Sequence, residues 1–512
     1  MGLFTGSLAR PTGPYAVSTT DLELSSSSPP DASFSHALLR STGRPALQMD
    51  TVLLTLYHPS NPHKNGSGQR QHWVQRPFGQ TAGGYARFLG QKPWLVKTFL
   101  WLLAARIRLP VEGDGALAFK GGFKDQAAKS GEAKQPRTSS DTLVGDETAK
   151  GDDTFPLVIF SHGLSGTRTS CSAWCTQIAS QGYIVAAIEH RDGTAPISVV
   201  RLGDGKERVV DYIKAQEHLV YPDGHTPLTE LEFRSPQLSL RLAEIREAVH
   251  IMRRINDGEG AKVAEENRRK DNGGEGVVGK WLGGWKGRVG LEGKMIMAGH
   301  SFGAATTIQA LRSSTSQLPF TRGIALDPWV DPIPPAPSSA EPGSSPTKAA
   351  TRESEPAATA SAGKGDKGDG KVPLDVKVPL LIINSEAFTL WRVHYKLVRG
   401  IAEAVKGGRG WLMSVVGSVH TSFTDLPILF PFMSRFEGAR VSPTAGMGAI
   451  TQACQEFLAG EGSKGKLLGR EVVPGDEEGG RPGEGEKGEK GKKKKVMEGV
   501  VGEVRMHVRG TE

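Results

Sequence analysis

A serine between two glycines is the residue of this sequence with the clearest chemical potential. The pentapeptide G-H-S-F-G occupies residues 299–303. The apolar run 295–298 before it predicts a buried strand, and residues 304–311 after it favour a helix. This setting is typical of a nucleophile elbow, where glycine tolerates the crowded, strained backbone. We therefore predict that Ser301 is a nucleophile and that the backbone N–H of Phe302 stabilises an oxyanion. The alternative is an ordinary glycine-rich turn in a chain with 65 glycines.

A serine hydroxyl is a weak nucleophile at neutral pH and needs a base whose tautomer is fixed by a third group. Candidates for the base and for this third group both follow Ser301 along the chain. Asp327 ends a predicted strand that begins at Thr321, and His420 follows the predicted last strand, 411–416. The order serine, acid, histidine is one of those known for serine hydrolases. Asp331, across the same Pro-Trp turn, is the alternative acid, and an aspartate before proline also serves simply as a turn cap.

The other histidines fit the role of base less well. His162 and His190 precede the serine, which is the wrong chain order. His300 lies inside the elbow, where its side chain cannot turn onto its neighbour. His394 lies within a predicted helix, 388–404. His420 is therefore the predicted base.

A second oxyanion donor is expected where another buried strand ends. Residues 155–161 form an apolar run that continues into His162-Gly163-Leu164. A strand that ends in His-Gly resembles the loop that supplies the second backbone donor in serine hydrolases of this chain order. We therefore predict that the N–H of Leu164 faces the oxyanion.

The same region shows a strand–helix–strand rhythm. A predicted helix at 170–181 is followed by a predicted buried strand at 183–188, and Ser235-Pro236 predicts the start of another helix. Alternation of this kind predicts an α/β protein with a mostly parallel sheet covered by helices on both faces.

Composition predicts how the 512 residues are organised. Hydrophobic residues make up only 37% of the chain, which indicates a core diluted by unstructured segments. We predict a single domain over 1–458, with disordered insertions at about 112–153, 258–279 and 332–376. The Gly-, Glu- and Lys-rich residues 459–512 predict a disordered charged tail.

Charge, cysteine usage and motifs limit the partners. A net charge of +8 is mild, and no basic module for nucleic acid is visible. No metal or nucleotide motif occurs, so we expect no cofactor.

Three cysteines, no signal peptide and no membrane-spanning run predict a cytoplasmic protein. The most apolar segment, 93–106, is predicted to be a buried core helix, with peripheral contact to a membrane surface as the alternative.

Several blocks, in order, resemble the platelet-activating factor acetylhydrolases of the plasma/type II family. In that family the residues matching Ser301, Asp327 and His420 form the catalytic triad, and the backbone donors match Leu164 and Phe302. The blocks are FPLVIFSHGLSGTRTSCSAWCTQIASQGYIVAAIEHRDGTAP, GHSFGAATTIQAL, GIALDPWV, PLLIINSEAF and GSVHTSFTDLPILF.

The resemblance implies an α/β-hydrolase fold and a specific activity. It implies a calcium-independent serine esterase, a phospholipase A2 that removes acetyl or short, oxidised acyl chains from the sn-2 position of phospholipids. Two departures are visible: Ala304 stands where the family has a second glycine after the elbow, and compact members lack the long insertions. The alternatives are an α/β-hydrolase of other ester specificity and a non-enzymatic, membrane-associated scaffold.

Overall fold

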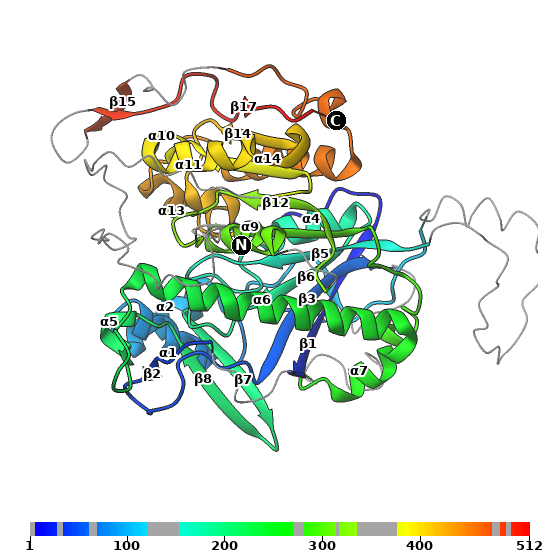
Figure 1. Cartoon of the computed structure of the whole chain (residues 1–512), viewed down its shortest axis with the longest axis vertical. Helices are drawn as coiled ribbons and strands as arrows, with labels where there is room; N and C mark the ends of the chain where they lie inside the picture. The colour runs from blue at the N-terminus through cyan, green and yellow to red at the C-terminus, as the bar shows by residue number, and fades with distance from the viewer. Residues whose placement is uncertain are drawn as a thin grey trace, which may run out of the picture.

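One sheet of eleven strands runs through the computed structural model (Figure 1). The structure describes residues 6–27, 34–60, 69–120, 153–269, 281–313, 317–334, 376–473, 482–487 and 493–511. The strands lie in the order β17-β14-β13-β12-β11-β5-β6-β3-β1-β4, and β10 also pairs with β5. Their bounds are β1 Ala16–Ser25, β3 Thr51–Ser60, β4 Glu112–Gly113, β5 Phe155–Ser161, β6 Ile184–Glu189, β10 Val289–Gly290, β11 Met295–His300, β12 Phe320–Leu326, β13 Leu380–Ser385, β14 Gly410–Val415 and β17 Val504–Val508.

The centre of the sheet is parallel. Strands β6, β5, β11, β12, β13 and β14 all run in one direction, whereas β3 pairs antiparallel with β6 and β1 antiparallel with β3. Every residue of β6, β11, β13 and β14 is buried, which explains why these strands are mostly apolar in the sequence. The predicted α/β-hydrolase architecture, a mostly parallel sheet, is confirmed.

Helices cover both faces because successive strand side chains point to opposite sides. In β5, Leu157 and Ile159 belong to one buried cluster, while Val158 and Phe160 belong to the other. Helices α6 (Glu230–Arg254), α9 (Phe302–Arg312) and α11 (Arg392–Glu403) contribute to the first cluster, and α4 (Ser172–Ser180) and α14 (Pro443–Ala459) to the second.

Helix α6 begins earlier than the sequence predicted. Its N-cap is Thr229, whose side chain accepts the Glu232 N–H while Glu232 binds back to Thr229 in a capping box. The prediction that Ser235 and Pro236 begin the helix was therefore wrong by about a turn and a half. Pro236 lies inside the helix as its seventh residue, so the Glu232 carbonyl receives no N–H from this position.

Helix α2 (Pro93–Leu103) is exposed, contrary to the predicted core helix. Val96 is its one buried residue. Trp94, Phe99 and Leu102 expose 63%, 56% and 67% of their surface, respectively. Apolar residues lie on every side of the helix. Only a minority of them pack against the protein.

The described edges of the predicted insertions and tail are structured, which corrects those boundaries. β4 begins at Glu112 and pairs with β1, and α7 spans Gly260–Glu266. In the predicted tail, β17 pairs antiparallel with β14 and closes that edge of the sheet. Residues 121–152, 270–279 and 335–375 of the predicted insertions lie outside the described residues, whereas most of the predicted tail is described.

The other elements are short and connect or flank the sheet. They are β2 Leu38–Leu39, α1 Phe78–Phe88, β7 Ile197–Gly203, β8 Lys206–Asp211, α5 Ala215–His218, β9 Leu219–Val220, α10 Glu386–Leu390, η3 His420–Phe423, α12 Leu426–Leu429, α13 Pro431–Phe436, β15 Pro482–Lys487 and β16 Lys493–Lys495. Over the described ranges, no helix combines the length and apolar character needed to cross a bilayer.

Candidate active site

The serine lies on a strained turn between β11 and α9. Ser301 has φ 59° and ψ −120°, which side-chain-bearing residues rarely adopt. The flanking glycines make this turn feasible. A Cβ on Gly299 would lie 2.2 Å from the Gly303 oxygen, and a Cβ on Gly303 would lie 2.0 Å from the Ser161 oxygen. The turn therefore has the geometry of a nucleophile elbow and presents Ser301 at the carboxyl edge of the sheet.

The predicted base and acid meet the serine at this edge. His420 Nε2 lies 2.8 Å from Ser301 Oγ, and His420 Nδ1 lies 2.7 Å from Asp327 Oδ2. A carboxylate only accepts, so Asp327 fixes the proton on Nδ1 and leaves Nε2 free to take one from the hydroxyl. Because β11, β12 and β14 are parallel, their carboxyl ends bring together three residues that are far apart in sequence.

Asp327 is itself held firmly. Its side chain is fully buried, and its Oδ1 accepts the Ser385 N–H at 2.6 Å. Its own N–H donates to the Ile383 oxygen at 2.7 Å, and its φ is 45°. Both carboxylate oxygens thus have donors, and the backbone is pinned to the end of β13.

The alternative residues lie elsewhere. Asp331, the alternative acid, has no hydrogen bond or ion pair to His420 in the described part of the chain. His394 Nε2 accepts the Val330 N–H at 3.2 Å, and burial lowers the pKa of His394 to about 4. His300 approaches the site, but its Nε2 donates to the backbone oxygen of His420 at 3.2 Å. His300 therefore supports the loop that carries His420.

The backbone after β5 runs directly against the serine. A Cβ on Gly163 would lie 2.7 Å from Ser301 Cβ and 3.2 Å from Ser301 Oγ. The next N–H along the chain is that of Leu164. Phe302 is the first residue of α9, so its N–H has no acceptor within the helix. Phe302 thus adjoins Ser301 in the chain, and Leu164 directly follows the glycine that packs against Ser301, so the assignment of both as oxyanion donors stays a prediction.

A buried histidine orients the first of these donors. His162 Nδ1 donates to the Gly163 oxygen at 2.8 Å, and His162 Nε2 accepts the His190 N–H at 3.1 Å. The Gly163 oxygen and the Leu164 N–H belong to the same peptide and point in opposite directions. Burial, with the nearby charges of His190 and Arg241, lowers the pKa of His162 to about 3. A neutral His162 therefore fixes the direction of the Leu164 N–H.

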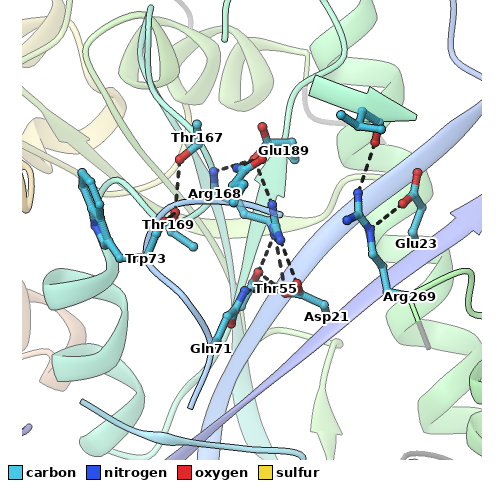
Figure 2. A network of polar contacts seen from close by, with 12 residues as sticks. Asp21, Glu23, Thr55, Gln71, Trp73, Thr167, Arg168, Thr169, Glu189 and Arg269 are labelled. Carbon is cyan, nitrogen blue, oxygen red and sulfur yellow. Dashed lines mark hydrogen bonds and ion pairs between the residues drawn. The ribbon is translucent and has the colours of Figure 1, made fainter. Parts of the chain in front are cut away.

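A buried charge network anchors the rest of this loop (Figure 2). Arg168 Nη2 lies 2.7 Å from Asp21 Oδ2, and its Nε donates to Thr55 at 2.9 Å. Its backbone N–H donates to Glu189 Oε2 at 2.8 Å. Burial raises the pKa of Asp21, but the Arg168 charge outweighs this and lowers it overall. The loop after β5 is thus tied to β1, β3 and β6.

Arg168 and Glu189 could not be identified from the sequence as anchors of this loop, because their partners are remote along the chain. His162 lies in the His-Gly motif that follows β5, but chain order bears only on its role as a base and does not reveal its hydrogen bond to the Gly163 oxygen. Among the described residues, no group of three or more potential metal ligands is found.

The site is partly open. The His420 side chain is 37% exposed, whereas Ser301 is 7% exposed. Phe388 packs edge-on against the imidazole of His420 with 4.5 Å between ring centroids, and Trp391 stacks on Phe388. An apolar wall therefore flanks the reactive groups on the side of α10.

Comparison with known proteins supports the resemblance seen in the sequence. The family described as platelet-activating factor acetylhydrolase, isoform II, matches residues 131–342. The Gallus gallus platelet-activating factor acetylhydrolase is 28% identical over 293 residues, which is 56% of this chain and 55% of that protein. The Cavia porcellus protein of the same name is 28% identical over 314 residues, 60% of this chain and 58% of its own. The chain spans little more than half the length of these relatives.

A solved structure, a ferulic acid esterase from Streptomyces cinnamoneus, is also similar. It covers 88% of this chain and 92% of its own, with a TM-score of 0.49 and 15% identity. A likeness this distant does not bear on substrate.

Proposed function

We propose that the chain, which is similar to platelet-activating factor acetylhydrolases, is a serine esterase acting on phospholipids. The specific activity proposed is a calcium-independent phospholipase A2 that hydrolyses the sn-2 acetyl or short, oxidised acyl ester of platelet-activating-factor-like lipids. The observation that carries the proposal is the hydrogen-bonded series from Asp327 through His420 to Ser301.

The proposed mechanism uses side chains and backbone groups of this chain. His420 Nε2 takes the proton of Ser301 as Oγ attacks the sn-2 carbonyl, and Asp327 stabilises the imidazolium. The N–H groups of Leu164 and Phe302 stabilise the oxyanion. His420 then protonates the leaving lyso-phospholipid oxygen. Water, deprotonated by the same imidazole, cleaves the acyl-enzyme and restores the serine.

Access to a lipid substrate is consistent with the exposed apolar helices. α12 follows directly after η3, which begins at His420, and α13 comes next. On α13, Phe436 exposes 87% of its surface. Together with the exposed residues of α2, this favours peripheral contact with a membrane surface, because aromatic side chains gain free energy at the lipid interface. The three cysteines are buried and unpaired, which supports a cytoplasmic location.

The test compares three substrates in the presence of a calcium chelator. We expect hydrolysis of 1-alkyl-2-acetyl-phosphocholine and of a water-soluble aryl acetate, and much slower hydrolysis of a phosphocholine with a long sn-2 chain. Hydrolysis of the aryl ester alone would contradict the phospholipid assignment and favour another ester specificity.

The matched control is Ser301→Ala. It should lower kcat on both good substrates by roughly 10⁴-fold or more, because the nucleophile is lost and only the oxyanion donors remain. Undiminished turnover in this variant would contradict the whole mechanism.

A further inference from the structure

An arginine-lined cavity lies beside the exposed apolar helix α2, away from Ser301. Its volume is about 220 Å³, and its walls include Leu8, Arg10, Arg70, Ile107, Arg108 and Pro110. No acidic side chain lines it. No ion pair involves these three arginines in the described part of the chain. The buried arginines Arg168 and Arg191, by contrast, each pair with a carboxylate. All three arginines of the cavity are exposed, and three guanidinium groups that pair with no described carboxylate create a positive potential around the hollow.

The walls of the cavity are held by backbone pairing. The Leu109 N–H donates to the Gln71 oxygen at 2.9 Å, and the Trp73 N–H donates to the Ile107 oxygen at 3.0 Å. Arg108 adds a bond from Nη1 to the Arg70 oxygen at 2.6 Å. Two of the three arginines therefore project from segments that are tied together, so the cluster does not depend on loose loop ends.

The third wall is the N-terminal segment. The Gly6 N–H donates to the Leu429 oxygen at 2.8 Å, which joins this segment to the end of α12. Arg10 follows on the same segment. The cavity thus lies between the end of α2, since Ile107 comes within a turn of Leu103, and the segment that leads into α13.

The pKa values of two neighbouring side chains, His72 and Arg76, are also lowered by the positive charge of nearby arginines. Partial burial, together with the charges of Arg76 and Arg108, lowers the pKa of His72 to about 4. Burial and Arg108 also lower the pKa of Arg76. A neutral His72 adds no further positive charge, and an anion would balance the charge of the arginines around it.

From the cavity, its charge and its place between exposed apolar helices, we propose that it binds the phosphate of an anionic phospholipid headgroup. Guanidinium groups match the geometry of phosphate oxygens. Helices whose aromatic side chains enter the lipid surface place flanking arginines at the level of the headgroups. The inference rests on the proposed action at lipid surfaces but concerns a site distinct from Ser301. Its role is to hold the enzyme on anionic membranes.

The experiment measures partition of the full chain onto phosphatidylcholine vesicles with and without phosphatidylglycerol. The variant is Arg10→Gln/Arg70→Gln, because in the described ranges neither guanidinium forms a hydrogen bond and folding should be unaffected. We expect binding of the parent to rise with phosphatidylglycerol, and the variant to lose roughly fivefold in partition for each arginine. Hydrolysis of a water-soluble aryl acetate should be unchanged.

The matched control removes the same charge elsewhere. Arg44→Gln/Arg246→Gln changes two exposed arginines outside the cavity and should bind like the parent. Equal loss in both variants, or no loss in the cavity variant, would overturn the site. Inorganic phosphate should displace the parent from phosphatidylglycerol vesicles better than chloride at equal ionic strength; equal displacement would contradict a discrete phosphate site. If the parent protein does not hydrolyse the aryl acetate, the proposed esterase activity is contradicted. The vesicle partition result then still decides whether this cavity binds phosphate.

Discussion

The change Asp327→Asn tests the role of the acid with little disturbance of the fold. Asparagine has the same shape and tolerates the positive φ of this position better than most residues. The Ser385 N–H, 2.6 Å from Oδ1, can only donate. The amide oxygen of the variant must therefore face Ser385, and its NH₂ must face His420.

That orientation changes the tautomer of His420. An NH₂ group directed at His420 Nδ1 makes this nitrogen an acceptor, so the proton moves to Nε2. A protonated Nε2 cannot accept the proton of Ser301, 2.8 Å away. We expect kcat to fall by about 10⁴-fold, or about 5 kcal/mol of transition-state stabilisation.

The assay is steady-state hydrolysis of an aryl acetate, with circular dichroism and thermal unfolding to verify the fold. Asp331→Asn is the matched control, since it makes the same change at the other acid of the Pro-Trp turn, and it should retain activity close to that of the parent. A loss below tenfold in Asp327→Asn, or an equal loss in Asp331→Asn, would refute this account of the acid.

Three further changes test the surroundings of the site. Gly163→Ala places a Cβ 2.7 Å from Ser301 Cβ, so we expect kcat to fall by about 10²-fold as the oxyanion donor moves; parent-like kcat would contradict the close approach. Arg168→Met leaves Asp21 buried without its partner and should lower the free energy of unfolding in urea by about 3–5 kcal/mol; a loss under about 1 kcal/mol would count against the network. Burial, then the Asp21 charge, raises the pKa of Asp114 to about 7. Because this exceeds the unfolded value of about 3.9, the folded state binds the extra proton and its stability falls as pH rises from about 4 to about 7. Asp114→Asn should flatten this slope in urea titrations, and an unchanged slope would show that another group causes it.

The strands around the site could be predicted because they are buried on both faces. Met295–His300 and Leu380–Ser385 each open with four consecutive apolar residues, the pattern typical of buried parallel strands. The elbow could be predicted as well, since Gly299 and Gly303 are sterically required. Local sequence thus determined where Ser301 and Asp327 lie in the sheet.

Helix α2 shows where local pattern fails. An apolar segment between charged residues is expected in a core, but burial depends on which surface the rest of the chain offers. Here that surface covers chiefly Val96. The apolar pattern is the same for a helix that packs inside a protein and for one that faces lipid, so sequence alone did not separate them.

Strand β17 was missed although a signal existed. Val504, Met506 and Val508 alternate with Arg505 and His507, and this alternation of apolar and polar residues is typical of a strand. The surrounding Gly-, Glu- and Lys-rich composition hid this short pattern.

Arg168 was unpredictable for a different reason. Its partner Asp21 is 147 positions away, and a basic residue in a loop is normally solvated.

The most direct test of the central claim is labelling of the full chain with a fluorophosphonate, followed by mass spectrometry of the modified peptide. The reagent reacts with a serine only when a neighbouring base activates its hydroxyl. We predict stoichiometric modification of Ser301, no modification of Ser301→Ala, and strongly reduced labelling of His420→Gln. Labelling at another residue, or none in the parent protein, would contradict the proposed catalytic serine.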